Sequence, residues 1–293
     1  MTERRNSMSN NESANHKSVV VHHQLREVQS RPGFRTVVAR CSAELDLDPI
    51  LNIELFHMSQ PTFAPHPHAG FSAVTYMLPE SDGALRNRDS LGDRSLIGPG
   101  ALHWTQAGAG VVHEELPDTL GQDCWGFQIF VDLAAADKQL APTILRAQAH
   151  EIPEIVAAGS KLRVVAGAFE QARSPVTELA GLATAVDLFD VTLEPGATLS
   201  LPLAAGRRAF VFAIDGSGEV GEQPIDGHEI VVLSEQGEGA LLRGHGQTLR
   251  ALVCAATPLR QPVVWGGPFA MSNEAELQAA RARFEAGEMG QLS

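Results

Sequence analysis

Short apolar runs that end at Gly, Pro, Asp or Asn recur along almost the whole chain, and no long helical period interrupts them. Runs of this kind, with turn residues at both ends, are typical of strands in sandwiches and barrels. The 27 glycines and 17 prolines are spread through the sequence, as a fold with many turns requires. The sequence therefore predicts an all-β fold. The expected strands cover residues 19–22, 34–39, 50–56, 71–78, 123–131, 162–166, 185–193, 209–214, 229–233 and 248–255.

The chain of 293 residues is long enough for two units, because single domains commonly contain about 100–200 residues. The halves are alike in outline: each has an apolar strand, an acidic turn with glycine (81–83 and 215–218) and a polar segment before the next strand. A shift to alanine-rich composition near 133–146 indicates a connector. We therefore expect a duplicated β-barrel. The expected parts are a mobile tail at 1–17, an N-terminal barrel at 18–135 and a C-terminal barrel at 136–293.

One helix is predicted near the end of the chain, at about 273–287. Asn273 and Glu276 form a variant of the capping box, and Gly287 provides the stop. The apolar stripe of this helix comprises Leu277, Ala280 and Phe284. We expect that face to pack on a barrel and assign it no chemistry.

Composition excludes several classes of function. The net charge of -13 repels phosphate backbones and anionic lipid surfaces, so we expect neither direct nucleic-acid binding nor membrane binding. The longest apolar stretches are far shorter than the roughly 18 residues that span a bilayer. The three cysteines, Cys41, Cys124 and Cys254, are far apart and form neither a disulfide framework nor a Cys-x-x-Cys site. The polar N-terminus lacks the apolar core of a signal peptide, and we expect a cytoplasmic protein.

Histidines cluster in the first half of the chain. They are His57, His66, His68, His103 and His113. His66-Pro67-His68 is a His-x-His pair, and residue 113 begins a His-x-Glu pair that ends at Glu115. In an extended chain, residues i and i+2 point the same way, so each pair presents two ligand atoms to one point.

Two such pairs on neighbouring strands predict a metal site made of His66, His68, His113 and Glu115. Imidazole nitrogens with one carboxylate suit Fe(II), Cu, Ni, Mn or Zn and leave coordination positions open. The alternative is that a His-x-His pair in a loop decorates the surface. The glycine-rich run at 97–112, whose turns direct a strand back into a barrel mouth, favours the metal site.

Further motifs accompany these residues in order along the chain, and together they resemble those of the pirin family, whose members are bicupins with two barrels. The matching residues are Leu47-Asp48-Pro49, His66-Pro67-His68, Gly70-Phe71, Val74-Thr75-Tyr76, Arg88-Asp89-Ser90, Gly92, Pro99-Gly100, Trp104, Ala107-Gly108, Gly110, His113, Glu115 and Gly267-Pro268-Phe269-Ala270-Met271. The resemblance runs from about residue 25 to residue 290.

The resemblance implies that a metal, usually iron, is held in the N-terminal barrel by the same four residues, and that the second barrel carries no metal. It also implies a dioxygenase of the quercetin 2,3-dioxygenase type, in which Glu115 takes the proton of a phenolic substrate. The alternative that it implies is a metal- or redox-responsive regulator that acts through contacts with a protein partner. A third possibility is a relative that binds metal but has lost both roles.

Several neighbours of the ligands depart from the family pattern, which bears on substrate preference rather than on metal binding. They are Ala69, Ser72, Ala101, His103 and Ala109. His103 is either a pocket donor or proton shuttle, or a strand residue bonded to a backbone carbonyl. His57 is expected to be structural or exposed.

A Gly-x-Gly-x-x-Gly pattern at 216–221 invites a dinucleotide-binding interpretation. That fingerprint must open a helix, whereas the turn-rich residues 223–227 follow here. We expect a hairpin at this position instead.

Overall fold

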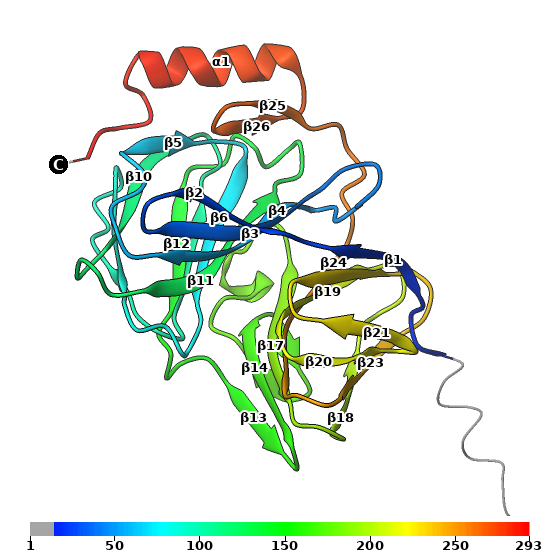
Figure 1. Cartoon of the computed structure of the whole chain (residues 1–293). Helices are drawn as coiled ribbons and strands as arrows, with labels where there is room; N and C mark the ends of the chain where they lie inside the picture. Colours follow the sequence, from blue (N-terminus) through cyan, green and yellow to red (C-terminus); the bar gives the residue numbers. More distant parts are fainter. Residues whose placement is uncertain (1–14, 293) are drawn as a thin grey trace, which may run out of the picture. The chain divides into compact units, whose positions relative to one another are not determined.

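The computed structural model describes residues 15–292, which fold into two compact units (Figure 1). The first barrel comprises Leu25–Pro153, Val164–Val186 and Pro258–Ser293. The second barrel comprises residues 15–24, Glu154–Arg163 and Asp187–Thr257. Each unit contains one seven-stranded and one four-stranded sheet. This arrangement confirms the all-β fold with two barrels and a C-terminal helix.

The first barrel contains a seven-stranded sheet in the order β12-β9-β6-β11-β4-β3-β2. Its strands are β12 (Thr143–Ala147), β9 (Leu102–Gln106), β6 (Phe71–Met77), β11 (Cys124–Asp132), β4 (Ile50–Met58), β3 (Phe34–Arg40) and β2 (Glu27–Arg31). The four-stranded sheet consists of β5 (His66–His68), β10 (Val111–Pro117), β7 (Leu85–Asp89) and β8 (Leu96–Ile97). The printed pairings in both sheets are antiparallel.

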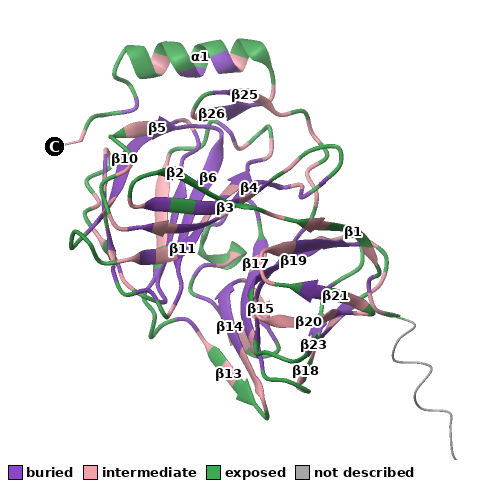
Figure 2. Cartoon of the chain, viewed as in Figure 1, coloured by how far each residue is buried: buried purple, intermediate pink, exposed green. Residues whose placement is uncertain are grey.

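The core of the first barrel joins side chains of both sheets. One buried cluster includes Phe56 of β4, Met77 of β6, Leu85 of β7 and Ile97 of β8. Strand β6 is buried along its whole length, as Figure 2 shows. A strand covered on both faces has no need of polar alternation, which explains why its sequence is mostly apolar and contains only the buried Ser72 and Thr75 as polar residues.

The second barrel repeats this pair of sheets. Its seven-stranded sheet contains β1 (Val19–Gln24), β22 (Glu229–Leu233), β19 (Arg208–Asp215), β24 (Leu249–Ala256), β17 (Val186–Leu193), β14 (Ser160–Ala166) and β13 (Glu154–Ala157). Its four-stranded sheet contains β18 (Thr198–Pro202), β23 (Gly239–Gly244), β20 (Ser217–Val220) and β21 (Gln223–Asp226). The pairing of β20 with β21 confirms the hairpin expected at the glycine-rich pattern.

Shorter elements complete the chain. They are β15 (Ala168–Phe169), β16 (Ala172–Arg173), the 3₁₀ helix η2 (Glu178–Ala180), β25 (Val264–Gly266), β26 (Phe269–Met271) and α1 (Glu274–Glu285). The Asn273 side chain accepts a hydrogen bond from the Glu276 backbone N–H at 3.0 Å, as the predicted cap requires. Leu277 and Ala280 of α1 are buried in a cluster with Phe269 and Met271. The helix thus packs on the β25-β26 hairpin of its own unit.

The two units do not follow the expected boundaries at 18–135 and 136–293. Strand β1 pairs with β22, more than 200 residues later, and therefore belongs to the second barrel. Pro258–Ser293, which contains α1, belongs to the first barrel. Of the expected tail, residues 1–14 lie outside the described residues, whereas Lys17 is buried. The Lys17 ammonium donates to the carbonyls of Arg207 (3.1 Å) and Glu235 (3.0 Å).

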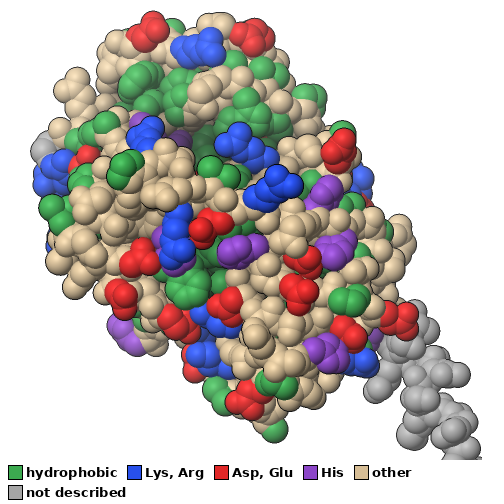
Figure 3. Space-filling view, in the orientation of Figure 1, with side chains coloured by type: hydrophobic (Ala, Val, Ile, Leu, Met, Phe, Trp, Pro, Cys, Tyr) green, Lys and Arg blue, Asp and Glu red, His purple; other side chains and the backbone are tan. Residues whose placement is uncertain are grey.

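Within the described chain, α1 and the other helical segment are too short and too polar to cross a membrane. On the face drawn in Figure 3, Lys and Arg side chains are interspersed with Asp and Glu side chains and with histidines.

Candidate metal centre

Two neighbouring strands of the four-stranded sheet carry the four predicted ligands. Strand β5 contributes His66 and His68, and β10 contributes His113 and Glu115. The strands are antiparallel, and His113 lies directly opposite His66. Because alternate residues of a strand point to one side, this register brings the residues of both pairs to the same face of the sheet.

The three imidazole rings converge. The centroid of His68 lies 4.8 Å from those of His66 and His113, and the latter two rings are 4.9 Å apart. One nitrogen from each ring can be chosen so that all three atoms lie within 4.8 Å of one another. Glu115 is not part of this group. The structure therefore brings together three of the four predicted ligands and places the fourth beside them.

Burial keeps the inner histidines uncharged. Desolvation, followed by the charge of His66, lowers the pKa of His68 to about 3. The pKa of His113 is also lowered well below its usual value, by burial and then by His68 and His66. Neutral imidazoles bind metal without first releasing a proton. The Nδ1 of His66 lies 2.9 Å from the Ala64 carbonyl, so this nitrogen donates and Nε2 keeps its lone pair.

Glu115 has the opposite electrostatic behaviour. The residue is only 9% exposed. Desolvation raises the pKa of its carboxyl group to about 7, against a smaller lowering by a hydrogen bond from Thr75. The Thr75 hydroxyl donates to Oε2 of Glu115 at 2.6 Å. A carboxyl group that titrates near neutral pH can accept or release a proton under working conditions.

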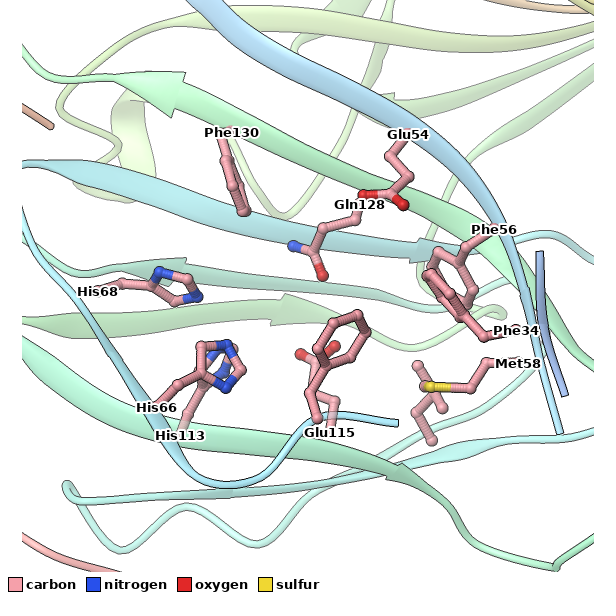
Figure 4. A pocket seen from close by; sticks show the side chains of 12 residues that line it. Phe34, Glu54, Phe56, Met58, His66, His68, His113, Glu115, Gln128 and Phe130 are labelled. Carbon is pink, nitrogen blue, oxygen red and sulfur yellow. The ribbon is translucent and has the colours of Figure 1, made fainter. Parts of the chain in front are cut away.

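The four residues line one pocket of about 670 Å³, a volume that includes its open mouth. Its wall is mostly apolar and aromatic. It contains Phe34, Phe56, Met58, Phe63, Leu85 and Phe130, with Glu54 and Gln128 as additional polar residues. In Figure 4 the histidines lie at one end, Phe34, Phe56 and Met58 at the other, and Glu115 between them. An apolar and aromatic pocket with a few convergent polar groups suits a small organic molecule.

A divalent transition metal fits these residues. Three imidazoles with a carboxylate nearby form the nitrogen and oxygen donor set that such metals prefer. The buried Nδ1 of His113 has no hydrogen-bond partner among the described residues. Buried polar atoms are normally satisfied, so an unpartnered imidazole nitrogen among other imidazoles is a feature that a ligand or ion would explain.

The other conspicuous histidines lie away from this pocket. His103 is buried on β9, with its Nδ1 3.4 Å from the Ser95 hydroxyl, and burial lowers its pKa to about 4. It approaches Asp89 and Asp93 closely enough to form a second possible metal group. However, the Asp93 carboxylate already accepts hydrogen bonds from Ser95 and Arg146, which indicates a structural network.

His57 is half-buried, bonds Asp123 through Nδ1 at 2.6 Å and stacks on Trp125. Neither His103 nor His57 lines the pocket. The structure thus agrees with the expectation that His57 has a structural role. His103 has a side-chain partner, and neither the expected carbonyl partner nor a role in the pocket is observed in the described part of the chain.

Sequence reasoning missed two kinds of residue. The first is Thr75, which was noted only as part of a motif and not as the partner of Glu115. The second is the aromatic wall of β3 and β4, represented by Phe34 and Phe56. These strands precede the histidine motifs, and only strand pairing brings them to the pocket. Alternation within β3 was the available signal, since Phe34 is buried and Arg35 is exposed.

The chain forms two barrels, and each is built of a seven- and a four-stranded sheet. A histidine cluster lines a pocket in the first barrel. Together these features define a bicupin protein. The Pirin family model matches residues 46–131, and the model of the Pirin C-terminal cupin domain matches residues 188–290. The chain belongs to the pirin family.

Curated relatives and solved structures agree with this assignment. The chain is 34% identical to a pirin-like protein of Caulobacter vibrioides, over 82% of this chain and 87% of that protein. It is also 34% identical to a Pseudomonas aeruginosa protein that bears the provisional name quercetin 2,3-dioxygenase, over 80% and 84% of the two chains. A crystal structure of quercetin 2,3-dioxygenase from Acinetobacter baumannii superposes with a TM-score of 0.83. Its sequence identity is 26%, and the match covers 95% of this chain and all of that one.

Proposed function

We propose that this protein is a metal-dependent dioxygenase that cleaves quercetin-like flavonols, with the metal held by His66, His68, His113 and Glu115. The three-imidazole cluster at the end of an aromatic pocket is the observation that carries the proposal. The names of two relatives as quercetin 2,3-dioxygenases support the substrate class. Three free cysteines, two of them buried, are compatible with the cytoplasm as the site of action.

The metal would supply Lewis acidity, and a redox-active ion would also supply the electron transfer that chemistry with O2 requires. Fe(II) is our first choice, with Cu, Ni and Mn as alternatives. Zn also suits these ligands, but it has no redox chemistry and would supply Lewis acidity alone. The residues of the chain would do the rest. His66, His68 and His113 would hold the ion, and Phe34, Phe56 and Phe130 would stack on the flat substrate and exclude water.

Glu115 would accept the proton of the reacting substrate hydroxyl. Its position between the histidines and the aromatic wall places it beside any molecule that reaches both (Figure 4). A base is most effective when its pKa lies near the working pH, and in the metal-free protein burial raises the pKa of Glu115 to about 7. When a metal binds, the same carboxylate can also serve as its fourth protein ligand.

The test combines metal analysis with oxygen uptake. Protein purified without chelator should contain about one equivalent of a transition metal and should consume O2 with quercetin, giving a ring-cleaved product. His66→Ala with His113→Ala should abolish both metal content and turnover, and Glu115→Gln should abolish turnover. His57→Gln changes an imidazole of the same barrel outside the pocket, and it should preserve both.

The outcomes separate the two parts of the proposal. A wild-type protein without stoichiometric metal would overturn the metal centre. Stoichiometric metal without oxygen uptake for any flavonol would overturn the dioxygenase and favour a metal-responsive regulator that acts on a protein partner.

A further inference from the structure

The hydrogen bond between Thr75 and the pocket residue Glu115 is buried. Thr75 is 1% exposed, and its hydroxyl lies 2.6 Å from Oε2 of Glu115. The two residues are 40 positions apart and come from different sheets, β6 and β10. A hydrogen bond to an ionised carboxylate in a low-dielectric interior is stronger than one between neutral groups.

The register of the strands determines the neighbours of Thr75. Thr75 lies opposite Gln128 of β11 on one side and opposite His103 of β9 on the other. The Gln128 amide donates to the Val74 carbonyl at 3.1 Å, and its Oε1 lies 3.3 Å from the Thr75 hydroxyl. A hydroxyl has one proton to donate, and the distances assign that proton to Glu115 rather than to Gln128.

We propose that Thr75 is the positioning residue for Glu115, an inference that rests on the proposed function. The hydroxyl engages Oε2 and leaves Oε1 of Glu115 to meet a metal ion or the proton of a substrate hydroxyl. The carboxylate lies outside the compact group of the three imidazole nitrogens. Thr75 sets its direction from the opposite sheet.

A purely structural threonine would fill space without acting through Glu115, and two substitutions distinguish these roles. Thr75→Val keeps the shape and removes the hydroxyl, whereas Thr75→Ser keeps the hydroxyl. Thr105→Val is the matched control, because Thr105 is also 1% exposed and lies on adjacent β9. Its hydroxyl has no hydrogen-bond partner within the described chain.

The experiment titrates each purified, metal-free variant with Co(II), whose visible absorption reports the number and type of ligands. We expect Thr75→Val to weaken Co(II) binding about 10- to 100-fold, the usual effect of losing a group that orients a metal ligand. Its absorption spectrum should also change. Thr75→Ser should restore both the affinity and the spectrum, and Thr105→Val should resemble the wild type.

A double-mutant cycle shows whether the effect passes through the carboxylate. In a Glu115→Ala background, Thr75→Val should change Co(II) affinity by less than about twofold, because the residue through which it acts has been removed. If Thr75→Val does not fold, Thr75→Ala gives the same comparison with a small cavity in place of a methyl group.

Each negative result has a distinct meaning. Wild-type affinity and spectrum in Thr75→Val would overturn the role of Thr75 and leave the metal centre intact. A full effect of Thr75→Val in the Glu115→Ala background would show that Thr75 does not act through Glu115. A wild-type protein that fails to bind Co(II) would overturn the proposed metal centre and this inference together.

Discussion

The pKa values of individual side chains at the candidate metal centre are shifted in opposite directions by the same cause. Burial lowers the pKa of His68 and His113 and raises the pKa of Glu115. All three shifts favour the uncharged form, because desolvation penalises charge of either sign. Near neutral pH His68 and His113 are therefore uncharged, and Glu115 is close to the midpoint of its titration.

The carboxyl group of Glu115 makes the stability of the metal-free protein depend on pH. Because its pKa rises from 4.5 to about 7, its contribution to stability is present below pH 4.5 and is lost as the pH rises through 7. Glutamine stays neutral throughout. We therefore expect the free energy of unfolding of Glu115→Gln, relative to that of the wild type, to rise by about 3 kcal/mol from pH 4 to pH 8. Each unit of pKa corresponds to about 1.36 kcal/mol. Urea unfolding of chelator-treated protein at the two pH values measures this difference.

The control for this prediction is Glu285→Gln, at an exposed position of α1. Its free energy of unfolding relative to wild type should change little between the same pH values. A Glu115→Gln difference that is constant from pH 4 to pH 8 would contradict the raised pKa of Glu115.

At the scale of elements, the turn after β5 is held by the C-terminal hairpin of the same unit. The Lys138 ammonium is fully buried and donates to the carbonyls of Gly70 (2.8 Å) and Ala270 (3.0 Å), and it pairs with Asp132. One cation thus connects Gly70, which lies two residues after His68, with β26. The position of His68 consequently depends on contacts with the last part of the chain.

Replacing Lys138 with Met leaves the Asp132 carboxylate buried without its cation. Removing one partner of a buried pair costs about 3–5 kcal/mol, so we expect Lys138→Met to lower the free energy of unfolding by that amount. Adding Asp132→Asn should recover part of the loss, because the unpaired charge is removed. Chemical unfolding of both variants measures the difference. Equal stability of the single and double variants would contradict the importance of the ion pair.

Substitution of Gly70 tests how closely the turn after β5 approaches β26. The φ of Gly70 is +86°, and a Cβ atom at this position would lie 2.0 Å from the Ala270 carbonyl oxygen. Gly92 has a similar φ of +91° but open space around it. Gly92→Ala should therefore cost about 1–2 kcal/mol for the backbone conformation alone. Gly70→Ala should cost clearly more and should weaken metal binding, as thermal unfolding and Co(II) titration would show. Equal costs at the two positions would contradict the predicted clash.

Most of the longer strands were predictable from sequence because their signal is local. The run at 50–56 corresponds to β4 and that at 209–214 to β19, with ends that differ by one or two residues. Short strands such as β5 and β7 lack an apolar run and were found only through their pairing. The same limit applies at the site. The alternation of His66 with His68 is visible in the sequence, whereas the bond from Thr75 to Glu115 depends on how two sheets face each other.

For the whole molecule, the chain does not divide into two consecutive domains. Strand β1 belongs to the second barrel, and Pro258–Ser293 belongs to the first. A cut near residue 135 would therefore separate β1 from the second barrel and residues 136–153, 164–186 and 258–293 from the first. Local sequence patterns give no sign of this exchange, because a strand such as β1 has the same composition whichever sheet it joins.

Deletion of residues 258–293 tests this organisation. The segment supplies Phe269, Met271 and Leu277 to a buried cluster that also contains Ala69 and Val112, neighbours of the candidate ligands. Burial of each large apolar side chain contributes about 1.5–3 kcal/mol, so losing three of them removes much of the 5–15 kcal/mol that stabilises an ordinary domain. We expect the truncated protein to lose cooperative thermal unfolding and Co(II) binding, whereas deletion of 291–293 alone should preserve both. Near-ultraviolet circular dichroism and Co(II) titration measure these properties. Wild-type melting and metal affinity after removal of 258–293 would show that the first barrel holds its site without the C-terminal segment.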